Sequence, residues 1–182
     1  MTIEKTPFDG LVIIRPCVFS DGRGSFFESW NEELFKKNGL DVEFVQDNQS
    51  ISCQGVIRGL HFQVAPMDQG KLVRVAMGSV LDVAVDLRWN QPTFGQHFKM
   101  VLDSTDNSML FIPPGFAHGF RSLKHHTILI YKCTKAYSKA HEKAIKWNDK
   151  DLAIDWGVTE AIVSEKDGFA PSFNEFLNNP NF

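Results

Sequence analysis

Residues 71–88 read KLVRVAMGSVLDVAVDLR, two runs of β-forming residues that meet at Gly78-Ser79. This pattern predicts two strands joined by a tight hairpin turn. Because side chains alternate across a strand, the second run has one face made of Leu81, Val83, Val85 and Leu87. The opposite face holds Val80, Asp82, Ala84 and Asp86, so we expect Asp82 to sit mid-strand among apolar neighbours.

Similar runs recur along the chain and are separated by Gly, Pro and Asp. We expect strands at 11–19, 25–30, 43–52, 55–63, 71–78, 79–88, 97–102, 108–113, 119–123 and 127–134. Helices are expected only over 31–40 and around 172–177. Many short strands at similar spacing predict a mainly β sandwich, jelly roll or barrel. The chain has no linker-like stretch or internal repeat, which favours one domain over residues 1–182.

Composition narrows the class of protein. The 182 residues are 43% hydrophobic and 23% charged with a formal net charge of -3, which is ordinary for a globular protein and disfavours a general nucleic-acid binder. Apolar runs stay well below the roughly 20 residues of a membrane span. Three widely separated cysteines, Cys17, Cys53 and Cys133, favour free thiols in a reducing cytoplasm.

Two histidine motifs raise the question of a metal site. PPGFAHGF (113–120) fits one half of a cupin metal-binding pattern, whereas RGLHFQ (58–63) has Gln63 where a second histidine would stand. Glutamine is a poor ligand for zinc or iron, and no glutamate follows within a few residues. We therefore expect no metal at His61 and His118, and two histidines hydrogen-bonded for structural reasons remain a second interpretation.

Three polar residues fall in the middle of apolar strands, namely His61, Asp82 and Tyr131. A closed barrel would bury them, and buried polar groups require hydrogen-bond partners. Pairing with one another is one way to satisfy them.

Ten motifs occur in a specific order: FSDGRGSFFE (19–28), QDNQS (46–50), GVIRGLHFQ (55–63), KLV (71–73), VLDVAVDLR (80–88), PTFG (92–95), IPPGFAHGF (112–120), YKCTKAY (131–137), IKWND (145–149) and SEKD (164–167). Together they resemble the dTDP-4-dehydrorhamnose 3,5-epimerase family over about residues 8–170. The resemblance implies a cupin-like antiparallel jelly-roll barrel that works without metal or cofactor as a homodimer. It also implies an isomerase that converts dTDP-4-dehydro-6-deoxy-D-glucose to dTDP-4-dehydro-L-rhamnose by epimerising C3 and C5.

The same resemblance implies residue roles. His61 matches the general base and Tyr131 the general acid on the opposite face of the sugar. Phe26 matches a residue that stacks on thymine, with Phe19 as a weaker candidate, and Tyr137 matches a second tyrosine beside the sugar. The other matched substrate-binding positions are Arg23, Glu28, Gln46, Asn48, Arg58, Lys71, His118, Glu142 and Lys166.

The residue types suit this chemistry. Inverting a carbon beside a ketone needs a proton taken from one face and another returned to the opposite face. Histidine, with a reference pKa of about 6.5, can accept a proton near neutrality, and tyrosine, near 10, can donate one. The enolate oxygen needs donors, for which Lys71 is the first choice with Arg58 assisting. A carboxylate should orient His61; Asp82 is favoured for its mid-strand place, and Asp167 remains open.

Other functions stay possible at this point. A single-site 3- or 5-epimerase acting on a related nucleotide keto sugar would use the same residues. A metal-dependent cupin enzyme and a non-catalytic module that binds sugar nucleotides are the rivals from other classes.

Overall fold

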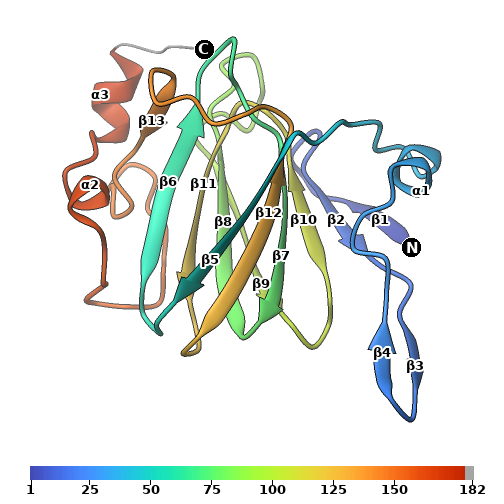
Figure 1. Ribbon diagram of the computed structural model, residues 1–182. Coiled ribbons are helices and arrows are strands. Elements are labelled where there is room, and N and C mark those ends of the chain that lie inside the picture. Colours follow the sequence, from blue (N-terminus) through green and yellow to red (C-terminus); the bar gives the residue numbers. More distant parts are fainter. Residues whose placement is uncertain (179–182) are drawn as a thin grey trace.

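The computed structural model describes residues 1–178; the last four residues of the expected domain, 179–182, lie outside the described residues. Two antiparallel sheets face each other (Figure 1). One sheet has the strand order β1 (Thr2–Lys5), β2 (Val12–Arg15), β10 (Met109–Ile112), β7 (Lys71–Met77), β12 (Thr127–Cys133) and β5 (Gln46–Ser52). The other has the order β13 (Glu142–Ala144), β6 (Ile57–Gln63), β11 (Phe116–Ser122), β8 (Ser79–Asp86) and β9 (His97–Asp103). The predicted cupin-like jelly-roll class is confirmed.

The remaining elements are short. A two-stranded ribbon pairs β3 (Phe19–Asp21) with β4 (Gly24–Phe26), and the helices are α1 (Glu32–Lys37), α2 (Glu165–Gly168) and α3 (Phe173–Leu177). The Asn31 side chain caps α1 by accepting a hydrogen bond from the Leu34 amide. The helix ends at Lys37, earlier than predicted, with lysines in its last turn and Gly39 beyond it at a positive φ.

The junction of residues 71–88 differs from the predicted hairpin. β7 pairs with β10 and β12 in one sheet, whereas β8 pairs with β9 and β11 in the other. The chain crosses between the sheets at Gly78, which has a φ of 85°. A Cβ atom there would lie 2.5 Å from Oγ1 of Thr127, so only glycine fits this corner.

The predicted alternation along β8 is confirmed. Val80 and Ala84 point into the core between the two sheets, where they pack with residues such as Val73 and Leu129. Val83 and Val85 point the other way and pack beneath the C-terminal segment, which contributes Trp156, Phe173 and Phe176. The outer face of the other sheet is covered by α1 through the fully buried Phe35. Burying such a side chain contributes roughly 1.5–3 kcal/mol.

Several predicted boundaries were wrong. The expected strand at 11–19 divides around Pro16 into β2 and β3, because proline cannot donate to the ladder. The expected strand at 25–30 ends at Phe26, and the short elements β1, β13 and α2 were missed. β1 and β13 have three or four residues at sheet edges, so their sequences carry too little periodicity to predict a strand.

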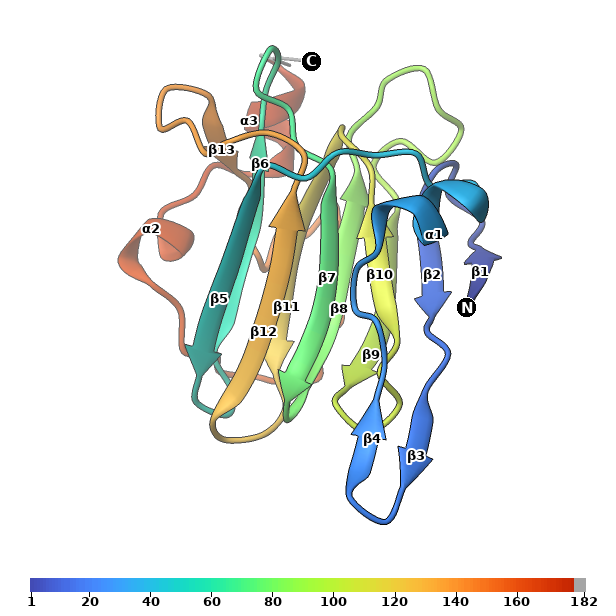
Figure 2. The same ribbon diagram turned by 45° about the vertical axis from the view of Figure 1, so that its right-hand side comes forward.

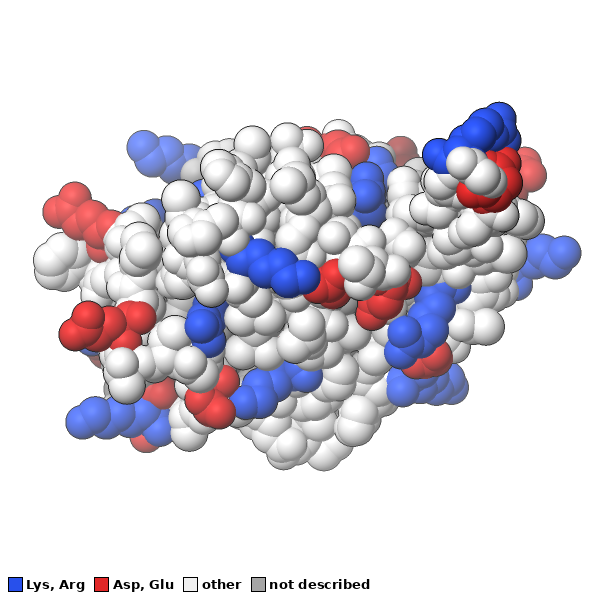
Figure 3. Space-filling model, turned by 90° about the horizontal axis from the view of Figure 1, so that it is seen from below, with Lys and Arg blue, Asp and Glu red and all other residues white. Residues whose placement is uncertain are grey.

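The ribbon of β3 and β4 projects from the body of the sandwich (Figure 2). Its aromatic side chains are exposed, Phe19 by 62% and Phe26 by 65%. Figure 3 looks at the molecule from the end toward which the ribbon projects; acidic and basic residues are interspersed there, with neutral surface between them. Among the described helices, none is both long and apolar enough to cross a membrane.

Candidate active site

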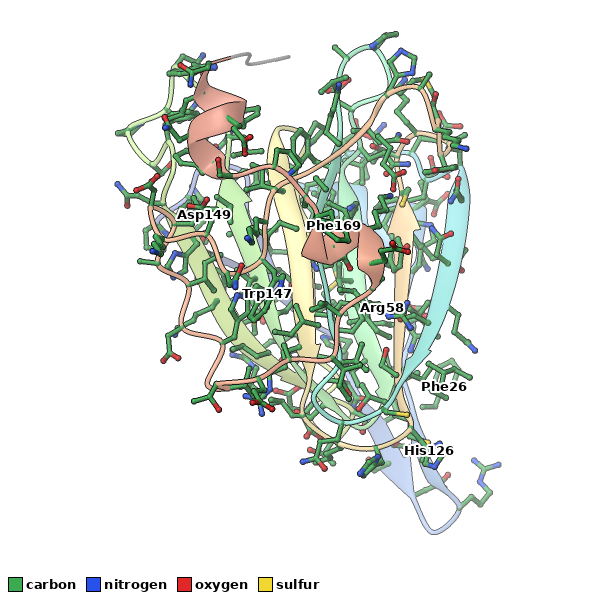
Figure 4. The ribbon with its side chains drawn as sticks, turned by 90° about the vertical axis from the view of Figure 1, so that its left-hand side faces the viewer. Phe26, Arg58, His126, Trp147, Asp149 and Phe169 are labelled. Atoms are coloured by element: carbon green, nitrogen blue, oxygen red, sulfur yellow. The ribbon has the colours of Figure 1, made fainter. Side chains whose placement is uncertain are left out.

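A cavity of about 720 Å³ opens between the sheets near β5 and β6, which lie at or next to a sheet edge. Its lining contains many of the residues predicted from the sequence: Gln46, Asn48, Arg58, His61, Lys71, His118, Tyr131, Tyr137, Glu142, Lys166 and Asp167. Figure 4 views the side on which α2 packs near β6, with Arg58 beside the helix and Phe26 further toward the ribbon. Within the described part of the chain, Arg23, Phe26 and Glu28 are not part of this lining.

His61 on β6 pairs with Asp167 on α2, with 2.5 Å between Nε2 and Oδ1. Ser164 caps this short helix by accepting a hydrogen bond from the Asp167 amide, and only 3% of the Asp167 side chain is exposed. Burial would raise the pKa of Asp167, but the hydrogen bond and charge of His61 outweigh it and lower that pKa. Asp167 therefore stays ionised near neutrality and orients His61.

The preference for Asp82 as the partner of His61 was wrong. Asp82 is fully buried on β8, and both of its oxygens lie within hydrogen-bond distance of His118 Nε2, at 3.0 and 3.1 Å. β11 lies between β8 and β6, so His118 stands between Asp82 and His61. The mid-strand argument correctly placed a buried carboxylate, but strand order decided which histidine it meets. The structure thus has two histidine–aspartate pairs, whose histidines face each other on the neighbouring strands β6 and β11.

Arg58 reaches the cavity because β6 contains a bulge. Opposite β11, His61 faces His118 and Arg58 faces Phe120, so β6 has one residue more than its partner over this stretch. Strict alternation would have put Arg58 on the face of Leu60, away from His61. The backbones approach closely here, since a Cβ on Gly59 would lie 2.5 Å from Cα of Gly119. Arg58 then spans to the facing sheet and donates to Ser52 Oγ at 3.2 Å.

Lys71 and Tyr131 come from adjacent strands of the sheet that faces His61. Lys71 is 8% exposed, and its Nζ lies 3.4 Å from the backbone oxygen of His61. Burial lowers the pKa of Lys71, an effect opposed by the nearby acidic groups Asp82 and Glu142. Burial raises the pKa of Tyr131 above its usual range near 10, so its phenol is protonated at neutral pH.

A chain of hydrogen bonds orders the polar residues at the cavity's upper end. Gln46 Oε1 accepts from the Tyr137 amide, Gln46 Nε2 donates to Asn48, and Asn48 donates to Cys133 Sγ at 3.5 Å. The Tyr137 hydroxyl donates to Glu142, which also forms a 2.5 Å ion pair with Lys166. Partial burial would raise the pKa of Glu142, but the contacts with Lys166 and Tyr137 outweigh this effect and lower that pKa.

Sequence reasoning missed several residues of the cavity wall, among them Cys133, Ser164 and Gln63. Cys133 shares a strand face with Tyr131, and this alternation was the signal that could have identified it. From the sequence alone, Gln63 is notable only because it stands where a second histidine ligand would. In the structure, its carboxamide forms hydrogen bonds with backbone groups of two loops. Within residues 1–178, no three His, Cys, Asp or Glu side chains converge to hold a metal ion, so the donor set does not fit a cupin metal centre.

The family model described as dTDP-4-dehydrorhamnose 3,5-epimerase matches residues 5–175. The chain belongs to the dTDP-4-dehydrorhamnose 3,5-epimerase family. It is 50% identical over 166 residues to the dTDP-4-dehydrorhamnose 3,5-epimerase of Methanothermobacter thermautotrophicus, covering 90% of this chain and 89% of that protein.

Solved structures of similar proteins extend the family comparison. A dTDP-6-deoxy-D-glucose-3,5-epimerase from Legionella pneumophila, in complex with dTDP-4-keto-L-rhamnose, has a TM-score of 0.90 and 43% identity, covering 95% of this chain and 93% of its own. A 3'-monoepimerase from Streptomyces bikiniensis, in complex with dTDP-quinovose, has a TM-score of 0.91 and 30% identity, covering 96% and 89%. The epimerase family therefore shares this fold across enzymes with different numbers of epimerised carbons.

Proposed function

We propose that the chain is a cofactor-independent isomerase that epimerises C3 and C5 of dTDP-4-dehydro-6-deoxy-D-glucose to give dTDP-4-dehydro-L-rhamnose. The observation that carries the proposal is the placement of His61 and Tyr131. They line one cavity from two facing sheets, on β6 and β12. A sugar ring bound between them would present opposite faces to a base and to an acid, as inversion requires.

His61, oriented by Asp167, removes the proton from the carbon beside the C4 ketone. The electron pair moves into the ring carbon–carbon bond and onto the C4 oxygen, which gives an enolate. The Lys71 ammonium supplies positive charge and a donor for that oxygen, and the His118 ring, held by Asp82, lines the same cavity. Tyr131 then delivers its phenolic proton to the opposite face as the ketone re-forms, and solvent restores both groups. The same sequence acts on the second carbon.

The charge and donors of the cavity suit a nucleoside diphosphate sugar. Arg58 is held across the mouth by Ser52 and the Ile51 carbonyl, and a guanidinium matches the oxygens of a diphosphate well. Gln46 and Asn48 lie on the inward face of β5, and Lys166 lies at the opposite side on α2. The Legionella relative was solved with dTDP-4-keto-L-rhamnose, which supports the same ligand class here.

A homodimer completes this proposal. Arg23, Phe26 and Glu28 are expected to bind substrate, yet they lie on or beside a ribbon that projects from the body of the same chain (Figure 2). The exposed Phe19 and Phe26 give the ribbon an apolar surface suited to burial against a second copy. We propose that each ribbon serves the partner's cavity and that the protein works in the cytoplasm, where Cys17, Cys53 and Cys133 stay free thiols.

A mixing experiment tests the dimer. The Arg23→Ala and His61→Ala variants would each be inactive, but unfolding and refolding them together would form mixed dimers. One cavity in each mixed dimer would then have both its own His61 and an intact partner ribbon, so about a quarter of wild-type activity is expected. No recovered activity in a mixture shown to contain mixed dimers would refute ribbon exchange.

Solvent exchange tests the reaction itself. The protein is incubated with dTDP-4-dehydro-6-deoxy-D-glucose in deuterated water, and C3 and C5 are followed by NMR. Deuterium at both carbons with inversion is expected, and its absence from both would refute an epimerase. Deuterium at one carbon would instead establish a single-site enzyme, the second candidate, which the likeness to the Streptomyces 3'-monoepimerase favours.

A further inference from the structure

Gln63 lies two residues beyond His61 on β6 and is 4% exposed. Its carboxamide contacts the backbone on both sides of Tyr137. Nε2 donates to the Ala136 carbonyl at 3.2 Å, and Oε1 accepts from the Ser138 amide at 2.6 Å. The second Nε2 hydrogen goes to the Met67 carbonyl at 2.7 Å, so the side chain joins two loops.

The segment around Tyr137 depends on such contacts. β12 ends at Cys133 and β13 begins at Glu142, which makes residues 134–141 a loop rather than part of a ladder. The Tyr137 amide donates to Gln46 Oε1 at 2.7 Å, so two glutamine side chains hold three consecutive residues of the loop. The Tyr137 side chain is half-exposed and lines the cavity, with its hydroxyl 3.0 Å from Glu142 Oε2.

Only a carboxamide meets these requirements at position 63. It must donate to two carbonyl oxygens and accept from one amide at the same time, and the three partners are backbone groups. A carboxylate could accept from Ser138 but could not donate to Ala136 or Met67. A methionine could fill a similar volume but would leave the backbone groups near it unpaired.

We propose that Gln63 is a positioning residue that fixes Tyr137 at the wall of the sugar pocket. The proposal rests on the proposed function in one respect, since it assigns Tyr137 to contact with the sugar. Gln63 stands in the HFQ motif where a cupin metal-binding pattern would have a histidine, and this proposal gives it a structural role. It anchors the loop that closes one side of the cavity.

A double-mutant cycle tests this role in turnover. We expect Gln63→Met and Tyr137→Ala each to lower kcat/KM about tenfold, and the double variant to be no worse than Tyr137→Ala alone. A residue that acts through Tyr137 has nothing left to position once that side chain is gone. Losses that multiply in the double variant would overturn the proposal. Gln63→Glu, which keeps the acceptor for Ser138, should fall between wild type and Gln63→Met.

Amide hydrogen exchange tests the clamp without substrate. Gln63→Met should speed exchange of the Ser138 amide at least tenfold and leave the Leu129 amide in β12 unchanged. Equal acceleration at both amides, or none at Ser138, would overturn the proposal. Gln96→Met is the matched control, because Gln96 donates to the Pro92 carbonyl on an exposed loop; both readouts should match wild type. Inactive wild-type protein would refute the proposed function, whereas the exchange experiment would still decide on the clamp.

Discussion

His61 and Asp167 are separated by 106 residues in the chain, yet His61 Nε2 lies 2.5 Å from Asp167 Oδ1. This contact joins β6, which lies next to a sheet edge, to a four-residue helix near the C-terminal end of the described chain. An ionised Asp167 that accepts the Nε2 hydrogen leaves Nδ1 as the basic nitrogen of the ring. The contact therefore determines the orientation of the ring and which of its two nitrogens is free to act as the proposed base.

Asp167→Asn should keep the shape of this contact and remove its charge. Because an amide can donate to the ring, it favours the tautomer in which the wrong nitrogen is basic. We expect kcat for epimerisation to fall by about 10²–10⁴-fold. The measurement is the initial rate of product formation by NMR. Asp82→Asn changes a carboxylate of the other pair as the comparison, and an equal loss in both variants would argue against a special role for Asp167.

Tyr131→Phe should separate proton removal from inversion. His61 remains able to take the proton and return a deuteron to the same face, so exchange continues while inversion falls by about 10²–10⁴-fold. The ratio of deuterium incorporation to epimerised product, followed by NMR, is the measurement. If both processes fell together, Tyr131 would be required before the enolate forms, contrary to its assignment as the acid.

The alkaline limb of activity should report Lys71. Burial lowers the pKa of Lys71 and raises that of Tyr131, so with rising pH the lysine loses its proton first. Neutral Lys71 cannot stabilise the enolate charge. The decline in kcat should therefore begin at a pH below about 10.4, the pKa typical of a free lysine. In Lys71→Arg the charge persists, so whatever activity remains should decline only at higher pH. If this substitution left the alkaline limb of the kcat profile unchanged, that limb would belong to another titrating group.

Asp149→Ala should loosen the C-terminal segment that carries Asp167. The buried Asp149 carboxylate accepts from the amides of Asp151, Leu152 and Phe173, the last at the start of α3. Figure 4 shows Asp149 and Trp147 within the layer that covers the barrel on this side. We expect a loss of roughly 2–3 kcal/mol in the free energy of unfolding and a Tm lower by about 4–12 °C.

Asp103→Ala is the matched control for that change. Asp103 also accepts from a nearby amide, that of Thr105, and pairs with Lys124 at a more exposed position. Its replacement should cost less than about 1 kcal/mol by thermal or urea unfolding. Similar losses in the two variants would show that burial at Asp149 adds nothing.

The sequence correctly predicted which face of a strand a side chain occupies, because alternation within a strand is regular. It was less informative about contacts that depend on which strands pair with one another. Alternation along residues 79–88 correctly placed Val80 and Ala84 inside the barrel, because period-2 patterns depend only on the local backbone. The partner of His61 required knowledge of which strand lies between β6 and β8. The crossing at Gly78 similarly depends on Thr127, a residue far along the chain, and local turn preferences could not reveal it.

The extra residue in β6 has a further consequence for how this enzyme family can change. In a regular strand, every second side chain faces the cavity. The bulge shifts this alternation by one residue, so that β6 turns Arg58, His61 and Gln63 toward the cavity together. A regular strand of the same length would turn Arg58 toward the outer layer and leave His61 facing the cavity. The placement of the cation therefore depends on the bulge, whereas the placement of the base does not. A change that straightened β6 at Gly59 without shortening it would separate the proposed phosphate recognition from proton transfer without altering either functional side chain.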